Sequence, residues 1–176
     1  RVRAEAGGSG QSALVIGGGG RMGQWFARFL DAQGYAITVA DPAGCPDGFS
    51  SVTDWRTLAL DFDLVVVAAP LRASADVLHE LAQHKPRGIV FDVGSLKSPL
   101  VAGFEALRAA GVRATSIHPM FGPSANVLAG RHVIFVDLGD AAATAVARGL
   151  FAQTMAIAVE MSLADHDRLM GYVLGL

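Results

Sequence analysis

The stretch from residue 12 to residue 41 constrains the fold of this chain more than any other part of it. It starts with a short apolar run and reaches three glycines spaced Gly18-x-Gly20-x-x-Gly23, and a helical pattern and a second apolar run then lead to Asp41. This order predicts a parallel βαβ unit. Gly18 would permit the tight turn off the strand, Gly20 would let a ligand approach the backbone, and Gly23 would let the helix pack closely on the sheet.

The same stretch predicts a dinucleotide-binding site. A pyrophosphate would bind the free N–H groups at the start of the helix, which we expect to begin near Arg21 and Met22. Asp41 follows Gly20 at the spacing, about 20 residues, at which a carboxylate accepts a hydrogen bond from the ribose 2′-hydroxyl of NAD. Such a carboxylate repels the 2′-phosphate of NADP, so the sequence favours NAD, although Arg21 would suit either cofactor. A glycine-rich turn without a ligand is the alternative.

Apolar runs typical of strands alternate with helical patterns along most of the chain. Further strands are expected at residues 63–68, 88–91, 112–117, 132–136 and 155–159, and helices at 73–83, 99–110 and 141–151. This alternation predicts an α/β fold with a doubly wound, mostly parallel Rossmann-type sheet covered on both faces. We therefore assign residues 12–161 to an NAD-binding domain.

The two ends of the chain are not expected to belong to this domain. Residues 1–11 are small and polar and lack an initiating methionine, so we interpret them as a flexible linker or the edge of an excised piece. Ser162 followed by Asp165 predicts the start of a new helix. We expect residues 162–176 to be the truncated start of a C-terminal helical domain, or a helix that docks on another subunit.

Composition excludes several classes of function. Apolar residues make up 52% of the chain, enough for one full core, and the net charge of −2 gives no basic surface for nucleic acid or a membrane. The longest apolar runs are far too short to cross a bilayer. The single cysteine, Cys45, cannot form an intramolecular disulfide, which favours the reducing cytoplasm. No group of residues has the spacing of metal ligands, so no metal is expected.

Candidate site residues follow three successive strands, at the edge where ligands bind in open α/β sheets. Ala69 and Pro70, which we expect to bind the cofactor together with Met22, follow one expected strand, Ser95 and Lys97 follow the next, and His118 ends the third. A histidine there could take a proton from a hydroxyl while a nicotinamide accepts a hydride. The alternatives are a histidine that bonds only loop carbonyls and a serine loop that only caps a helix.

Four motifs in this order, GGGGRMG, DVGSLK, HPMFGP and HDRLM, resemble the prephenate/arogenate dehydrogenase family of tyrosine biosynthesis. The resemblance spans roughly residues 12–176, and HPMFGP is its most specific element. The form of the motifs is closest to the dehydrogenase part of bifunctional chorismate mutase/prephenate dehydrogenases, which is compatible with a chorismate mutase fused upstream. The resemblance implies NAD-dependent oxidative decarboxylation of prephenate to 4-hydroxyphenylpyruvate.

The resemblance also implies a role for each matched residue. His118 matches the catalytic histidine that accepts the proton of the C4 hydroxyl, and Ser95 matches the serine that positions this hydroxyl. Lys97 matches a lysine that would hold the anionic substrate, and His166 matches a histidine that faces the substrate pocket. The family's carboxylate-binding arginine and its dimer contacts belong to the helical domain, which implies a homodimer through that domain.

Three other functions remain open from the sequence. Arogenate or 4-amino-4-deoxyprephenate dehydrogenases share these motifs, and only substrate assays separate them from a prephenate enzyme. A β-hydroxyacid dehydrogenase would need a lysine in a later helix, for which no equivalent is found. A non-catalytic nucleotide-binding module would need the glycines and Asp41 but not Ser95 and His118.

Overall fold

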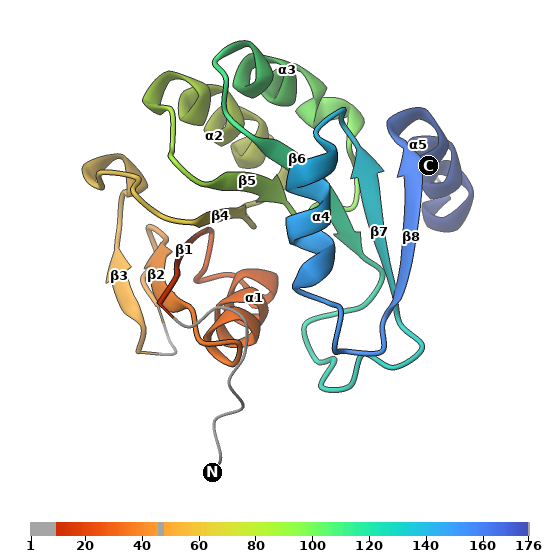
Figure 1. Cartoon of the computed structure of the whole chain (residues 1–176), viewed down its shortest axis with the longest axis horizontal. Helices are drawn as coiled ribbons and strands as arrows, with labels where there is room; N and C mark the ends of the chain where they lie inside the picture. The colour runs from red at the N-terminus through yellow and green to blue at the C-terminus, as the bar shows by residue number, and fades with distance from the viewer. Residues whose placement is uncertain (1–9, 46–47, 176) are drawn as a thin grey trace.

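The computed structural model describes residues 10–45 and 48–175, and these form one sheet with helices on both faces (Figure 1). The strands lie in the order β3-β2-β1-β4-β5-β6-β7-β8. Their bounds are β1 (Ser12–Ile16), β2 (Ala36–Ala40), β3 (Ser50–Val52), β4 (Leu64–Val67), β5 (Ile89–Asp92), β6 (Ala114–Pro119), β7 (His132–Asp137) and β8 (Ile157–Ser162). All neighbouring strands are parallel except β6 and β7.

The helices divide between the two faces of the sheet. Their bounds are α1 (Arg21–Asp31), α2 (Leu71–His84), α3 (Val101–Ala109), α4 (Ala141–Gly149) and α5 (Leu163–Leu174), with short 3-10 turns at η1 (Trp55–Thr57) and η2 (Ser98–Leu100). Helices α1 and α4 cover one face, whereas α2 and α3 cover the other (Figure 1). Helix α5 packs on β7 and β8 at the end of the sheet.

The core follows from the alternation of side chains along buried strands. Val15 and Phe91 point to the face that α1 and α4 cover, whereas their neighbours Leu14 and Val90 point to the α2 and α3 face. All four are fully buried. Central strands covered on both faces need apolar side chains on both sides, which explains their continuous apolar sequence.

The predicted α/β class and doubly wound, mostly parallel sheet are confirmed, with three differences in detail. Strand β3 is absent from the sequence prediction, since two of its three residues are serines at an exposed edge. Strand β8 begins at Ile157 rather than at residue 155, because Met155 has a positive φ of 58° and belongs to the preceding turn. Strand β7 runs antiparallel to β6, a direction that no residue pattern specifies.

The reversed strand β7 determines where α5 begins. The start of β7 lies beside the end of β6, because Val133 pairs with Pro119. Strand β8 is parallel to β7 and ends where Ser162 pairs with Asp137, at the amino-terminal edge of the central strands. Leu163 lines a cavity at that edge. Helix α5 therefore runs back toward the carboxyl end of β6.

The predicted cap of this last helix is confirmed. Ser162 is the N-cap of α5, and its hydroxyl accepts a hydrogen bond from the backbone N–H of Asp165. The division into domains at residues 161 and 162 stays a prediction, and residues 1–9 of the expected linker lie outside the described residues. Among the described residues, none of the helices is long and apolar enough to span a membrane.

Candidate active site

The loop between β1 and α1 is shaped by close contacts that only glycine permits. The left-handed residue of this turn is Gly17, with φ of 79°, rather than the predicted Gly18. Gly18 is required for a different reason, since a Cβ there would lie 2.6 Å from Cγ1 of Val39. The expected role of Gly23 is confirmed, because its Cβ would lie 2.2 Å from the carbonyl oxygen of Gly17.

The start of α1 suits an anionic ligand. Helix α1 begins at Arg21, as predicted, with Gly20 at its N-cap, and neither a side-chain cap nor an acidic residue occupies its first turn. The first N–H groups of a helix are unsatisfied by the helix itself and carry its positive dipole end. Among the described residues, a Cβ at Gly20 would meet only the carbonyl oxygen of Gly17 within 4 Å, at a tight 3.3 Å, so no other segment covers the backbone there. These groups fit a pyrophosphate.

Asp41 lies directly after β2 and reaches back to the glycine loop. Its Oδ2 accepts a hydrogen bond of 3.0 Å from the N–H of Gly19, and its Oδ1 accepts one of 2.8 Å from the N–H of Ala43. The carboxylate is thereby held beside the loop, at the end of the second strand of the βαβ unit. This is the position from which an acid contacts the adenosine ribose of a bound dinucleotide.

A cavity of about 370 Å³ lies at the carboxyl ends of the central strands. It is lined by residues from four separate segments, including Met22 of α1, Ala69 after β4, Ser95 after β5 and His118 of β6. Pro70, which follows Ala69, is the N-cap of α2. The structure thus brings together predicted cofactor-binding and catalytic residues that are far apart in the sequence.

His118 is the buried basic group of this cavity, with only 7% of its surface exposed. Its Nδ1 lies 3.0 Å from Nε2 of His166 on α5. Burial, followed by the charges of Lys97 and His166, lowers the pKa of His118 to about 4. His118 is therefore neutral at pH 7, as a proton acceptor must be.

Lys97 lies beneath the cavity, in contrast to its predicted place in the substrate pocket. The side chain is 1% exposed, and Nζ donates to Oδ2 of Asp92 at 2.7 Å and to the carbonyl oxygen of Ile117 at 2.8 Å. Burial lowers the pKa of Lys97, while Asp92 opposes this effect. Because Lys97 is not among the residues that line the cavity, its contacts indicate support of the loop.

His166 likewise lies behind His118 and is not among the lining residues of the cavity. It is fully buried, and its Nδ1 lies 2.8 Å from Oδ1 of Asp167. Asp167 also accepts hydrogen bonds from the loop after β5, at 2.9 Å from the N–H of Ser98 and at 3.3 Å from that of Lys97. Helix α5 is thereby tied to the loop that carries Ser95.

Sequence reasoning assigned no role to three residues that support this site, although two of them lie in the DVGSLK and HDRLM motifs. Asp92 ends the apolar strand β5 and binds both Lys97 and the hydroxyl of Ser116, and its position at the end of an apolar run is a usable signal. Asp167 directly follows His166 in the HDRLM motif. Trp25 gives no such signal, although its Nε1 donates to the carbonyl of Ala125 at 2.8 Å and fixes the loop after His118 on α1.

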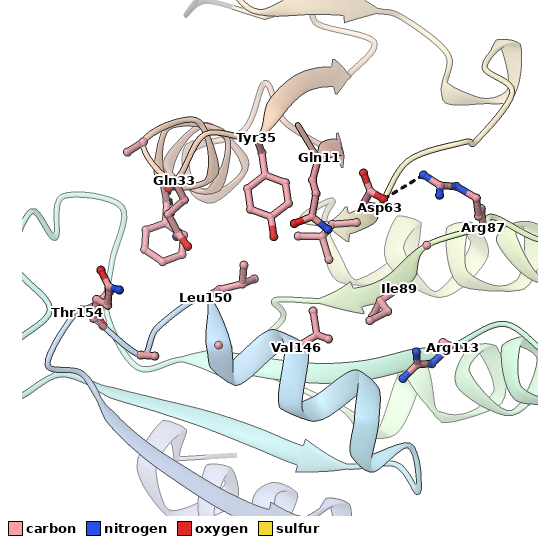
Figure 2. Close-up of a pocket in the computed structure, with 17 residues that line it drawn as sticks. Gln11, Gln33, Tyr35, Asp63, Arg87, Ile89, Arg113, Val146, Leu150 and Thr154 are labelled. Atoms are coloured by element: carbon pink, nitrogen blue, oxygen red, sulfur yellow. Dashed lines mark hydrogen bonds and ion pairs between the residues drawn. The ribbon is translucent and has the colours of Figure 1, made fainter. Parts of the chain in front are cut away.

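A larger cavity of about 670 Å³ lies at the opposite edge of the sheet (Figure 2). Gln11 and Tyr35, which immediately precede β1 and β2, contribute to its lining and point into it. Its charged groups have partners, since Asp63 pairs with Arg87 at 3.0 Å and Arg113 lies 3.5 Å from the carboxylate at the start of α4. The glycine loop and His118 are at the other edge, so we assign the candidate site there.

Among the described residues, no group of three or more histidine, cysteine, aspartate or glutamate side chains is arranged to hold a metal ion. The site therefore consists of a glycine loop, a cavity with a serine and a histidine, and a buried polar network behind them. Together with the sheet, these features define a Rossmann-type nucleotide-binding domain.

Comparison with known proteins identifies the family of this domain. The prephenate dehydrogenase nucleotide-binding domain matches residues 41–159. A 4-amino-4-deoxyprephenate dehydrogenase from Streptomyces pristinaespiralis is 33% identical over 89% of this chain and 56% of that protein. A probable arogenate/prephenate dehydrogenase from Methanocaldococcus jannaschii is 28% identical over 92% of this chain and 39% of that protein.

The fold agrees with a solved structure of the same family. The prephenate dehydrogenase from Aquifex aeolicus has a TM-score of 0.77 at 21% identity, over 93% of this chain and 66% of that chain. The chain belongs to the prephenate dehydrogenase family. It spans 39% and 56% of the length of the two curated relatives above. Because the chain belongs to this family, the cofactor of the domain is a nicotinamide dinucleotide.

Proposed function

We propose that the protein containing this chain is an NAD-dependent dehydrogenase that converts prephenate to 4-hydroxyphenylpyruvate by oxidative decarboxylation. The observation that carries the proposal is the cavity in which Ser95 and His118 meet Met22, next to the glycine loop. A hydroxyl group, a neutral histidine and a dinucleotide loop around one cavity suit the oxidation of a carbon that bears both a hydroxyl and a hydrogen.

The proposed roles follow from the chemistry of the substrate. His118 accepts the proton of the C4 hydroxyl as the carbonyl forms, and Ser95 holds the same oxygen by a hydrogen bond. NAD, when bound, provides the acceptor for the hydride from C4. The ring carboxylate leaves as CO2, its bonding electron pair makes the ring aromatic, and the proton on His118 returns to the phenolate oxygen.

The preference for NAD over NADP rests on Asp41. Both of its carboxylate oxygens accept backbone hydrogen bonds, from Gly19 and Ala43, which fix the negative charge beside the loop. A fixed carboxylate accepts from a ribose 2′-hydroxyl and repels a 2′-phosphate. We therefore expect a lower kcat/KM with NADP than with NAD.

A second candidate substrate is 4-amino-4-deoxyprephenate, because the relative at 33% identity is named as the dehydrogenase of that compound. Arogenate is the third, from the name of the relative at 28% identity. A homodimer, a fused chorismate mutase and a cytoplasmic location stay predictions from the sequence and its resemblance.

The test is NADH formation by the full-length protein with NAD and, in separate reactions, prephenate, arogenate and 4-amino-4-deoxyprephenate. We expect turnover with prephenate, and a repeat with NADP measures the cofactor preference. Faster turnover with either of the other compounds would reassign the substrate. The absence of NADH formation with all three compounds, in a sample that binds NAD, would overturn the proposed activity.

A further inference from the structure

A chain of three side chains extends from the cavity into the protein. His118 Nδ1 lies 3.0 Å from His166 Nε2, and His166 Nδ1 lies 2.8 Å from Asp167 Oδ1. Both imidazoles are buried, at 7% and 0% exposure. Because His166 takes part in both hydrogen bonds, the ring nitrogen of His166 that carries the hydrogen also constrains the protonation of His118.

We propose that Asp167 sets the tautomer of His118 through His166, and so leaves His118 Nε2 as the proton-accepting atom toward the cavity. A carboxylate only accepts hydrogen bonds, so His166 Nδ1 carries a hydrogen. Neutral His166 then has its lone pair on Nε2 and accepts from His118 Nδ1–H. His118 Nε2 is thereby left without a hydrogen. Asp167 is a positioning residue, and its role in turnover rests on the proposed function.

Asp167 is itself held in place as a carboxylate. Its Oδ2 accepts from both the N–H and the hydroxyl of Ser98, and its Oδ1 accepts from the N–H of Lys97. Burial raises the pKa of Asp167, but the hydrogen bonds from Ser98, His166 and the backbone outweigh it and lower the pKa below its usual value. At neutral pH the group therefore remains an acceptor for His166.

The same arrangement offsets the charge that forms when His118 accepts a proton. Burial and the nearby cation Lys97 both disfavour an imidazolium at His118. A proton added at Nε2 lets the Nδ1 proton shift toward His166, which lies against the carboxylate of Asp167. Among the described residues, the charged groups that face His118 are Lys97 from the loop after β5, with its partner Asp92 at the end of that strand, and His166 with Asp167 from α5.

The test is Asp167→Asn in the full-length protein, measured by ¹⁵N NMR of the histidine rings and by kinetics. The parent protein should have His118 protonated at Nδ1 and bare at Nε2. An amide that donates to His166 Nδ1 reverses both tautomers, so we expect His118 to gain a hydrogen on Nε2. The value of kcat should fall by about 10²–10⁴-fold, as when an amide replaces the carboxylate behind a catalytic histidine, with unchanged NAD affinity.

The matched control is Asp165→Asn, two residues earlier on α5. Asp165 is exposed and bonds to Ser162 and Arg168 rather than to a histidine, so the tautomers and kcat should both stay unchanged. A parent protein with the His118 hydrogen on Nε2 would overturn the proposal. A fall in kcat for Asp167→Asn without a change in the ring signals would do so too, since it would indicate a structural role alone.

The NMR experiment needs no turnover, so it separates the two proposals. A protein that is inactive with all three substrates but has the expected tautomers would lose the proposed function and keep the role of Asp167 in setting the tautomer. Turnover by a parent protein that carries the His118 hydrogen on Nε2 would keep the proposed function and overturn the role of Asp167.

Discussion

At the scale of single residues, His118 combines burial with a low affinity for protons. Its pKa of about 4 keeps it neutral over the whole physiological range, at the cost of weak basicity. Lys97 contributes to this low pKa from beneath the cavity, where Asp92 balances its charge. Removing either partner of this buried pair would leave an uncompensated charge, which is strongly destabilising. The pair therefore belongs to the structure that supports the base.

Replacing His118 by Asn tests the base directly. The variant keeps the glycine loop and Asp41, so NAD affinity in a titration should be nearly unchanged. The turnover of prephenate should fall by about 10²–10⁴-fold, the usual contribution of a general base. His79→Asn, at an exposed position of α2, is the matched control and should retain full activity. A loss smaller than about tenfold for His118→Asn would remove this residue from the role of base.

At the scale of elements, the close approach of α1 to the end of β1 holds the cofactor loop in shape. The contact is between backbone atoms, because the space at Gly23 is limited by the carbonyl of Gly17. Backbone atoms cannot rotate aside as a flexible side chain does. Any side chain at Gly23 therefore moves the first turn of α1, which is the part expected to bind the pyrophosphate.

Replacing Gly23 by Ala should both destabilise the fold and weaken the binding of the cofactor. An added methyl group that meets backbone at 2.2 Å should lower the free energy of unfolding by about 1–3 kcal/mol, the usual range for overpacking, in urea denaturation. NAD binding should weaken in the same variant. Gly149→Ala is the matched control, since a Cβ there meets no atom within 4 Å and φ is not positive. Equal NAD affinity in Gly23→Ala and the parent would contradict the assigned role of this contact.

The sequence pattern predicted the elements with strong periodicity. It did not predict the features that depend on how distant strands pair. The glycine loop, Asp41 and His118 were predictable because each follows an apolar strand at the edge where ligands bind. The contact between His118 and His166 joins residues 48 positions apart, and no local pattern specifies it. It depends on the reversed direction of β7, which the sequence does not encode locally. Lys97 was predicted at the substrate and was found beneath the cavity, because its ammonium group binds Asp92 of β5 and the carbonyl oxygen of Ile117 in β6.

At the scale of the whole molecule, the buried histidine makes stability depend on pH. His118 binds a proton near pH 6.5 in the unfolded chain but only near pH 4 in the folded protein. Between these values the unfolded state holds more protons. The contribution of neutral His118 to stability is therefore fully present above pH 6.5 and is lost as the pH falls toward 4.

The expected loss from His118 is about 3 kcal/mol in the free energy of unfolding between pH 7 and pH 4. Urea denaturation of the parent and of His118→Asn across this range measures it, because carboxylates with lowered pKa values, such as Asp63 and Glu80, act in both proteins. The difference between the two proteins should shrink or reverse in sign as the pH falls. A difference that is constant with pH would show that His118 titrates normally in the folded protein.

The reversed strand β7 also orders the steps by which the site is completed during folding. The bond that ties Asp41 to the glycine loop closes only 22 residues of chain, whereas the bond between the two histidines closes 48 and that between Ser98 and Asp167 closes 69. Longer closures cost more chain entropy and wait for the strands between them to pair. The glycine loop and Asp41 should thus form their contacts early during folding. His118 should gain its hydrogen bond with His166 only when β8 and α5 dock.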